Sequence, residues 1–189
     1  EKFLEDFLGT SPATSTISNS PLTQTDLVSR QLFSDYISLS SDKPVGTSII
    51  NTLANKYADN ILNETEPVSV QTRELIVVSD SEANLANYGS MVMNIRNKYK
   101  DLAAIQHNDR NLTDINSPGF ESFMSDASFL YQRAAGELLS VKVPASLALN
   151  HAALVSNYQT NMKAMQILAT ISSDPISALT ALNTYVKNT

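Results

Sequence analysis

Residues 79–106 read SDSEANLANYGSMVMNIRNKYKDLAAIQ, and their apolar positions recur at alternating steps of three and four. This spacing is typical of a heptad seam, the apolar stripe along a helix that packs against a neighbouring helix. Ser79 followed by Glu82 predicts a capping box, in which each side chain bonds a free backbone N–H of the first turn. The residues expected on the buried side are Leu85, Tyr88, Val92, Ile95, Tyr99, Leu102 and Gln106.

Two more segments keep nearly the same spacing and predict two further long helices. Ser117-Pro118 predicts the start of the first, because proline is tolerated in a first turn, and Pro144 predicts its end. The second is expected from about Ala145 to Ser172. At 1.5 Å per residue the three helices are each roughly 36 to 40 Å long, and matched helices favour antiparallel packing. Their stripes are Phe120, Phe123, Ala127, Leu130, Ala134, Leu138 and Val141, and then Leu147, His151, Leu154, Tyr158, Met162, Met165 and Ala169.

Shorter helices are predicted on either side of these three. One follows a cap at Thr23, a second follows Gly46 and stops at Pro67, and the last begins at the cap formed by Asp174 and Pro175. The sequence therefore predicts an all-α fold, an antiparallel helical bundle of about five to six helices, three of them long and heptad-patterned.

Residues 67–79 are the least helical part of the domain, because Val68 and Val70 alternate with polar residues and 75–78 is an aliphatic run. A single strand without a partner is not stable. We therefore expect an extended connector laid over the bundle, with a strand as the alternative.

Residues 1–23 differ from the rest of the chain. Residues 1–8 carry Phe and Leu at helical spacing and predict a short amphipathic helix, whereas 10–23 read TSPATSTISNSPLT, a Ser/Thr/Pro-rich linker. We therefore divide the chain into a flexible N-terminal stalk, 1–23, and a helical bundle domain, 24–189. This order of helix, stalk and domain is common just after the anchor of a membrane-tethered surface protein, and the alternative is a frayed terminus.

The composition excludes several classes of function. The 189 residues include 13 Lys and Arg against 19 Asp and Glu, a net charge of −6, and no basic stripe of the kind that binds nucleic acid. The absence of Cys removes disulfides, thiolate zinc sites and thiol nucleophiles. Only 17% of residues are charged, below the roughly 25% of a typical domain, and the polarity comes instead from 24 Ser, 15 Thr and 17 Asn.

The longest aliphatic run, 75–78, is far shorter than the roughly 20 residues that span a bilayer. A membrane connection is therefore expected only through an anchor upstream of Glu1.

His151 and His107 are the two histidines, and neither follows a Glu by three residues, which excludes a diiron-type bundle site. His151 lies on an apolar stripe and predicts a core imidazole bonded to a tyrosine or a backbone carbonyl; the alternative is a ligand-contacting or pH-responsive group. Asp109, Asn111 and Thr113 resemble the first ligands of a calcium loop, but the later positions do not match, so a solvated loop is favoured. No metal site and no cofactor is predicted.

The other candidate groups are tyrosines, methionines and one basic cluster. Seven tyrosines are spread over the helices, where their rings fill a core; if several cluster, they line a small-molecule pocket. Met91, Met93, Met162 and Met165 are interpreted as gap-filling core residues rather than a soft copper site. Arg96 and Lys100 share a helix face, interpreted as solvated surface. The candidate ligand-binding residues are His151, Tyr158, Met162 and Tyr88.

No phosphate loop, nucleophile elbow, dinucleotide fingerprint or zinc-protease motif is present, and no pair of acids stands on an apolar face. We therefore predict no catalytic residues and a protein that is not an enzyme.

Several short motifs stand in order along 24–189: RELIVVSDS at 73–81, Asn87-Tyr88-Gly89, Val143-Pro144, His151, Asp174-Pro175 and Tyr185. In this order the chain resembles uncharacterised envelope-anchored helical proteins of reduced-genome bacteria. The resemblance implies a single-span anchor and an outward-facing helical domain, and it implies no catalytic residues.

Together these patterns predict a non-enzymatic, extracytoplasmic structural or protein-interaction module of the bacterial cell envelope. The expected partner is another envelope protein or a second copy of the chain. The alternative is a small-molecule-binding or sensory helical bundle with a pocket lined by Tyr, Met and His.

Overall fold

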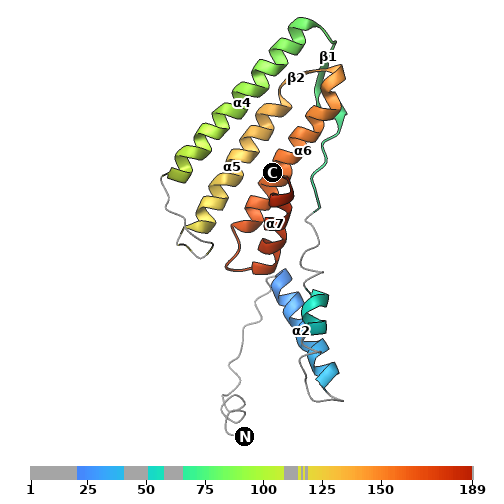
Figure 1. Cartoon of the computed structure of the whole chain (residues 1–189), viewed down its shortest axis with the longest axis vertical. Coiled ribbons are helices and arrows are strands. Elements are labelled where there is room, and N and C mark those ends of the chain that lie inside the picture. Colours follow the sequence, from blue (N-terminus) through green and yellow to red (C-terminus); the bar gives the residue numbers. More distant parts are fainter. Residues whose placement is uncertain are drawn as a thin grey trace.

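The computed structural model describes residues 21–40, 51–57, 66–108, 115, 117 and 119–188. Within them the chain is an all-α helical bundle apart from one pair of short strands (Figure 1). Most of the predicted stalk, 1–20, and the calcium-like pattern at 109–113 lie outside the described residues. The elements are α2 (Gln24–Ser40), a helical segment at 51–57, the 3-10 turn η1 (Thr72–Glu74), β1 (Ile76–Val78), α4 (Glu82–Asn108), α5 (Phe120–Leu139), β2 (Lys142–Pro144), the 3-10 turn η2 (Ala145–Leu147), α6 (Ala148–Leu168) and α7 (Pro175–Asn188).

The three long helices α4, α5 and α6 lie side by side (Figure 1), as their heptad spacing predicts. The closest packing joins α5 to α6 and α6 to α7, whereas α4 packs against α5 and β2. The short helix α7 covers α6 near the middle of the molecule. The helix α4 is therefore the outermost of the three long helices.

The core consists of two clusters. One lies where α5 and α6 meet the segment before β1, and the other lies where α6 meets α7. Alanines are frequent in both, which lets the helix backbones approach closely. Among the α4 side chains whose burial the structure describes, only Tyr99 is buried, at 7% exposure, whereas Leu85 and Leu102, expected on the buried side, are 42% and 37% exposed. The clusters contain Val70, Leu75, Ala135, Leu138, Ala148, Ala152 and Val155, and then Ala164, Met165, Leu168, Ala178 and Ala181.

The segment predicted as an extended connector contains a strand, so the alternative was correct. The strand β1 pairs in parallel with β2, and Val77 lies opposite Val143. The prediction missed the partner because the apolar spacing of α5 continues to Val141, whereas the helix ends at Leu139. Val141 and Val143 are both fully buried, so their apolar character reflects burial beside β1 rather than a helix face. Parallel strands need a long crossover, which α4 and α5 supply.

Two predicted helix caps have different outcomes. At the start of α2 the Thr23 hydroxyl accepts from the Asp26 amide at 3.1 Å and the Asp26 carboxylate accepts from the Thr23 amide at 3.0 Å, as predicted. The capping box at Ser79 was wrong. The Ser81 hydroxyl accepts from the Asn84 amide at 3.2 Å, so Ser81 is the cap of α4.

Asp174 joins α2 to the rest of the molecule. Its carboxylate accepts from the Ser177 amide at 3.3 Å, as a cap of α7, and from the amides of Gln24 and Thr25 at 3.1 and 3.0 Å. The Thr25 hydroxyl donates to the same carboxylate at 2.6 Å and accepts from the Ile176 amide at 3.1 Å. One carboxylate thus caps the first turns of two helices, where the partial positive charge of each helix is concentrated.

Candidate functional site

The four residues proposed to bind a ligand do not form one site. Tyr88 of α4 and His151 of α6 contact each other, with their rings edge to face at 5.5 Å. Tyr158 lies two turns further along α6 and lines a separate cavity. Met162 is half-buried another turn along and is not among the residues that line that cavity.

His151 is completely buried and uses both ring nitrogens. Nε2 lies 2.9 Å from the Leu138 carbonyl oxygen, and Nδ1 lies 3.1 Å from the Tyr88 hydroxyl. Because a carbonyl can only accept, Nε2 carries the proton, and Nδ1 accepts from the phenol. Burial raises the pKa of Tyr88, which keeps that phenol protonated and able to donate.

This arrangement makes His151 a structural connection between three helices. It confirms the prediction of a core imidazole, with both of the expected partner types present. The Leu138 carbonyl belongs to the last turn of α5 and also accepts from the Val141 amide at 3.0 Å, so the imidazole is a further donor to it. Within the described part of the chain, neither hydrogen-bond partner of His151 is a carboxylate.

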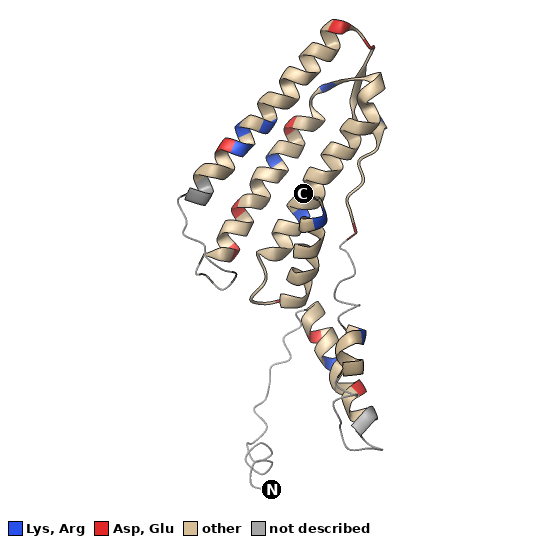
Figure 2. Cartoon of the chain, viewed as in Figure 1, with Lys and Arg blue, Asp and Glu red and all other residues tan. Residues whose placement is uncertain are grey.

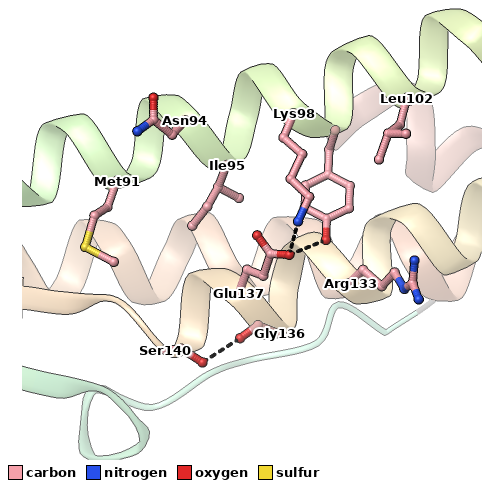
Figure 3. A pocket seen from close by; sticks show the side chains of 10 residues that line it. Met91, Asn94, Ile95, Lys98, Leu102, Arg133, Gly136, Glu137 and Ser140 are labelled. Carbon is pink, nitrogen blue, oxygen red and sulfur yellow. Dashed lines mark hydrogen bonds and ion pairs between the residues drawn. The ribbon is translucent and has the colours of Figure 1, made fainter.

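A groove of about 820 Å³ runs between α4 and α5 (Figure 3). At its centre the Glu137 carboxylate accepts from the Lys98 ammonium at 2.5 Å and from the Tyr99 hydroxyl at 2.8 Å. Lys98, followed by Tyr99, lowers the pKa of Glu137, so this carboxylate is ionised at neutral pH. Arg133 lies further along the same wall. Lys98 and Glu137 therefore compensate each other locally, Arg133 remains as a second cation, and Met91 and Ile95 of α4 add apolar lining.

A second cavity, which we call the tyrosine cavity, lies on the other side of the contact between α4 and α5. Its volume is about 310 Å³. Aromatic rings from three helices form its walls, and Arg96 and Lys100 of α4 line it as well. Tyr131 meets Tyr158 edge to face at 5.8 Å and Tyr185 at 6.4 Å. The aromatic residues that line it are Tyr99, Phe123, Tyr131 and Tyr158.

A third hollow belongs to the arm, the name we give to α2 with the helical segment 51–57. It measures about 500 Å³, and its lining is almost entirely apolar. The two parts of the arm are held together by Asp35, which accepts from Lys56 at 2.6 Å and from the Tyr57 hydroxyl at 2.7 Å. Phe33, on the open side of α2, is 67% exposed.

The structure separates the methionines that the sequence placed on two facing helices. Met91 and Met93 are 45% and 55% exposed on α4, so their interpretation as core residues is wrong, whereas Met165 is buried against α7 and confirms it. Throughout the described ranges, no three His, Asp or Glu side chains come close enough to hold a metal ion. Nor does any helix in these ranges combine the length and apolarity needed to span a bilayer.

Sequence reasoning missed the residues that combine into the tyrosine cavity. The sequence predicts a small-molecule pocket only if several tyrosines cluster, and Tyr131 and Tyr158 do lie together in the lining of this cavity. Arg96 and Lys100 were interpreted as plain surface because their own helix gives no sign of what faces them. The rings that lie near Arg96 and Lys100 belong to α5 and α6, and their position is known only from the folded structure.

No protein-family model, no curated protein sequence and no solved structure matches this chain.

Proposed function

We propose that this protein is a non-enzymatic interaction module that self-associates through its arm. The observation that carries the proposal is the exposure of Phe33, at 67%, beside the apolar hollow formed by Leu32, Tyr36 and Leu53. An apolar surface of this kind is typical of a protein–protein contact. The non-enzymatic part rests on the sequence, which lacks the catalytic motifs named above.

The geometry of the arm favours a second copy as the partner. Two helices can cover each other on one side only, and a second pair of helices from another copy would cover the remaining apolar side as in a four-helix bundle. The arm meets the rest of the molecule mainly through the N-terminal end of α2, beside α7, so its length remains accessible. Two arms related by a two-fold axis would bury the same patch on each copy.

The charge of the arm fits this pairing. Although the whole chain carries −6, the described residues of the arm contain two acids, Asp26 and Asp35, and two bases, Arg30 and Lys56. The described faces of two arms therefore carry no excess charge of either sign, and a strongly acidic or basic partner gains no attraction from them.

The experiment is sedimentation equilibrium of the full chain over a wide concentration range. We expect a dimer, and we expect Phe33→Asp to weaken it by at least about 100-fold, because a charge buried without a partner in an apolar contact is costly. The matched control is Phe129→Asp, since Phe129 on α5 is 59% exposed but lies outside the arm. Circular dichroism checks that both variants remain folded.

A chain that is monomeric at every concentration contradicts this proposal, and so does a dimer that Phe129→Asp dissociates and Phe33→Asp does not. In either case a different partner protein becomes the better hypothesis.

We also propose an extracytoplasmic location at the bacterial cell envelope. The support is the sequence: a surface wetted by Ser, Thr and Asn, no cysteine, and the Ser/Thr/Pro-rich segment 10–23. Protease treatment of intact cells that produce the tagged gene product tests it. We expect the tag to be lost from intact cells, and a tag that is cleaved only after lysis contradicts the proposal.

A further inference from the structure

The tyrosine cavity has the dimensions and the lining of a small-molecule site, independently of the arm. Its volume of about 310 Å³ lies at the lower end of the range for ligand pockets. Aromatic side chains from α4, α5 and α6 line it, and flat rings pack well against such side chains. Ala103, Ala127 and Ala134 lie between them, so short side chains leave room for an occupant.

The charge along the cavity has one sign. Arg96 and Lys100 line it one turn apart on α4, and no Asp or Glu lines it. Within the described part of the chain neither cation forms an ion pair, because the two ion pairs there use Lys56 and Lys98. The basic residues of α4 gather in its C-terminal half (Figure 2). The neighbouring groove differs, since Glu137 lies there beside its own cations.

The tyrosine side chains that line the cavity add no negative charge beside Arg96 and Lys100. Burial, followed by the contact with Tyr185, raises the pKa of Tyr131, so this phenol stays neutral at physiological pH. The Tyr99 hydroxyl donates to Glu137 on the other side of the helix contact, which leaves its ring as the wall. The Tyr158 hydroxyl has no hydrogen-bond partner among the described residues and can serve a ligand.

From this combination we infer that the tyrosine cavity binds a small organic anion that carries a flat ring. The ring packs between Tyr99, Tyr131 and Tyr158, and the anionic group faces Arg96 and Lys100. An uncharged ring of the same size fits the walls but gains nothing from the two cations. A ring that carries a positive charge is repelled by them.

The test uses three naphthalene probes of similar size on the full chain: 2-naphthalenesulfonate, uncharged 2-naphthalenemethanol and cationic 2-naphthylmethylammonium. The chain has no Trp, so tyrosine emission transferred to the probe reports binding near these rings. We expect the sulfonate to bind at least about ten-fold more tightly than the alcohol, the size of one charge-assisted hydrogen bond, and the ammonium to bind more weakly still.

Variants separate the charges from the walls. Arg96→Gln with Lys100→Gln should reduce sulfonate affinity by about ten-fold or more and leave the alcohol unchanged. The matched control is Arg73→Gln with Lys142→Gln, which removes two exposed cations elsewhere and should change neither affinity. Ala103→Trp, at an exposed position on the rim, should block all three probes.

Absence of sulfonate binding at millimolar concentration overturns the inference. So does equal affinity for the sulfonate and the alcohol, or equal loss in the two charge-neutralised double variants, because an apolar hollow or the net charge alone would then explain binding. Thermal unfolding of each variant confirms that a loss of binding is not a loss of fold.

Discussion

His151 carries a cost that its surroundings must offset. A buried imidazole without partners loses its hydrogen bonds to water, and each unpaired polar group costs about 1 to 3 kcal/mol. Tyr88 and the Leu138 carbonyl remove that cost in the native state. The same three groups therefore favour one packing of α4, α5 and α6 over others.

We predict that His151→Ala destabilises the protein by about 3 kcal/mol, from the cavity it leaves and from the loss of the hydrogen bonds to the Leu138 carbonyl and the Tyr88 hydroxyl. Tyr88→Phe should cost only about 1 kcal/mol, since Tyr88 lies at the edge and leaves a single ring nitrogen without its donor. Urea unfolding measures both. Equal losses for the two variants would show that the carbonyl contact contributes little.

Asp174 gives a second prediction at this scale. Asp174→Ala should cost about 1 to 2 kcal/mol as a lost helix cap and should speed amide exchange at both Thr25 and Ser177. Asp174→Asn keeps one side-chain oxygen as an acceptor and should cost less. Faster exchange at Ser177 alone would show that the carboxylate caps α7 without holding α2.

At the level of single residues, the sequence predicted what depends on helix periodicity and missed what depends on neighbours. His151 was placed inward because Leu147 and Leu154 flank it at helical spacing. Arg96 and Lys100 could not be assigned a role, since the rings that face them come from α5 and α6. Contacts between residues far apart in the chain leave no pattern in the neighbouring residues, so a single sequence does not predict them.

Among the elements, the predicted starts were accurate for α2 and α7, where Thr23 and Asp174 cap the first turn. The end of α5 was wrong by several residues. The segment from Ser140 to Pro144 contains no glycine to end the helix before Pro144, and its valines fit a helix face and a buried strand equally well.

The arm provides a prediction that depends on pH. Lys56, with Tyr57 and Gln31, lowers the pKa of Asp35 from its ordinary 3.8 to about 2. A lowered carboxyl pKa means that the contact is fully present above about pH 4 and is lost as the pH falls through the folded value near 2. We therefore expect amide exchange in 51–57 to rise, relative to α7, between pH 4 and pH 2.

Asp35→Asn should abolish this pH dependence. If the wild-type arm shows no change over that interval, the carboxylate does not hold the two parts of the arm together.

For the molecule as a whole, charge and core are distributed unequally. Residues 1–66 contain nine acids and four bases, whereas 67–189 contain ten acids and nine bases. Both core clusters also lie within the second part. The nearly neutral part is therefore the one that contains the buried apolar core.

We predict that a chain of residues 66–189 unfolds cooperatively and has a thermal midpoint within a few degrees of the full chain, because it keeps both core clusters. It should also be monomeric, since it lacks the arm. Calorimetry and sedimentation measure the two properties. Gradual unfolding would show that α2 is part of the cooperative unit.

The parallel strand pair sets an order of events during folding. Its strands are joined only through the whole of α4 and α5, and the nearby bond from the Ser146 amide to Asp80 links positions 66 apart. Contacts across α5–α6 and α6–α7 close shorter loops and lose less chain entropy before they form. We therefore expect α4 to join last during folding and to open first in the native protein. The wall that carries Arg96 and Lys100 would then move away from the rings of α5 and α6 without unfolding the rest, which gives a ligand a route into a cavity built from three helices.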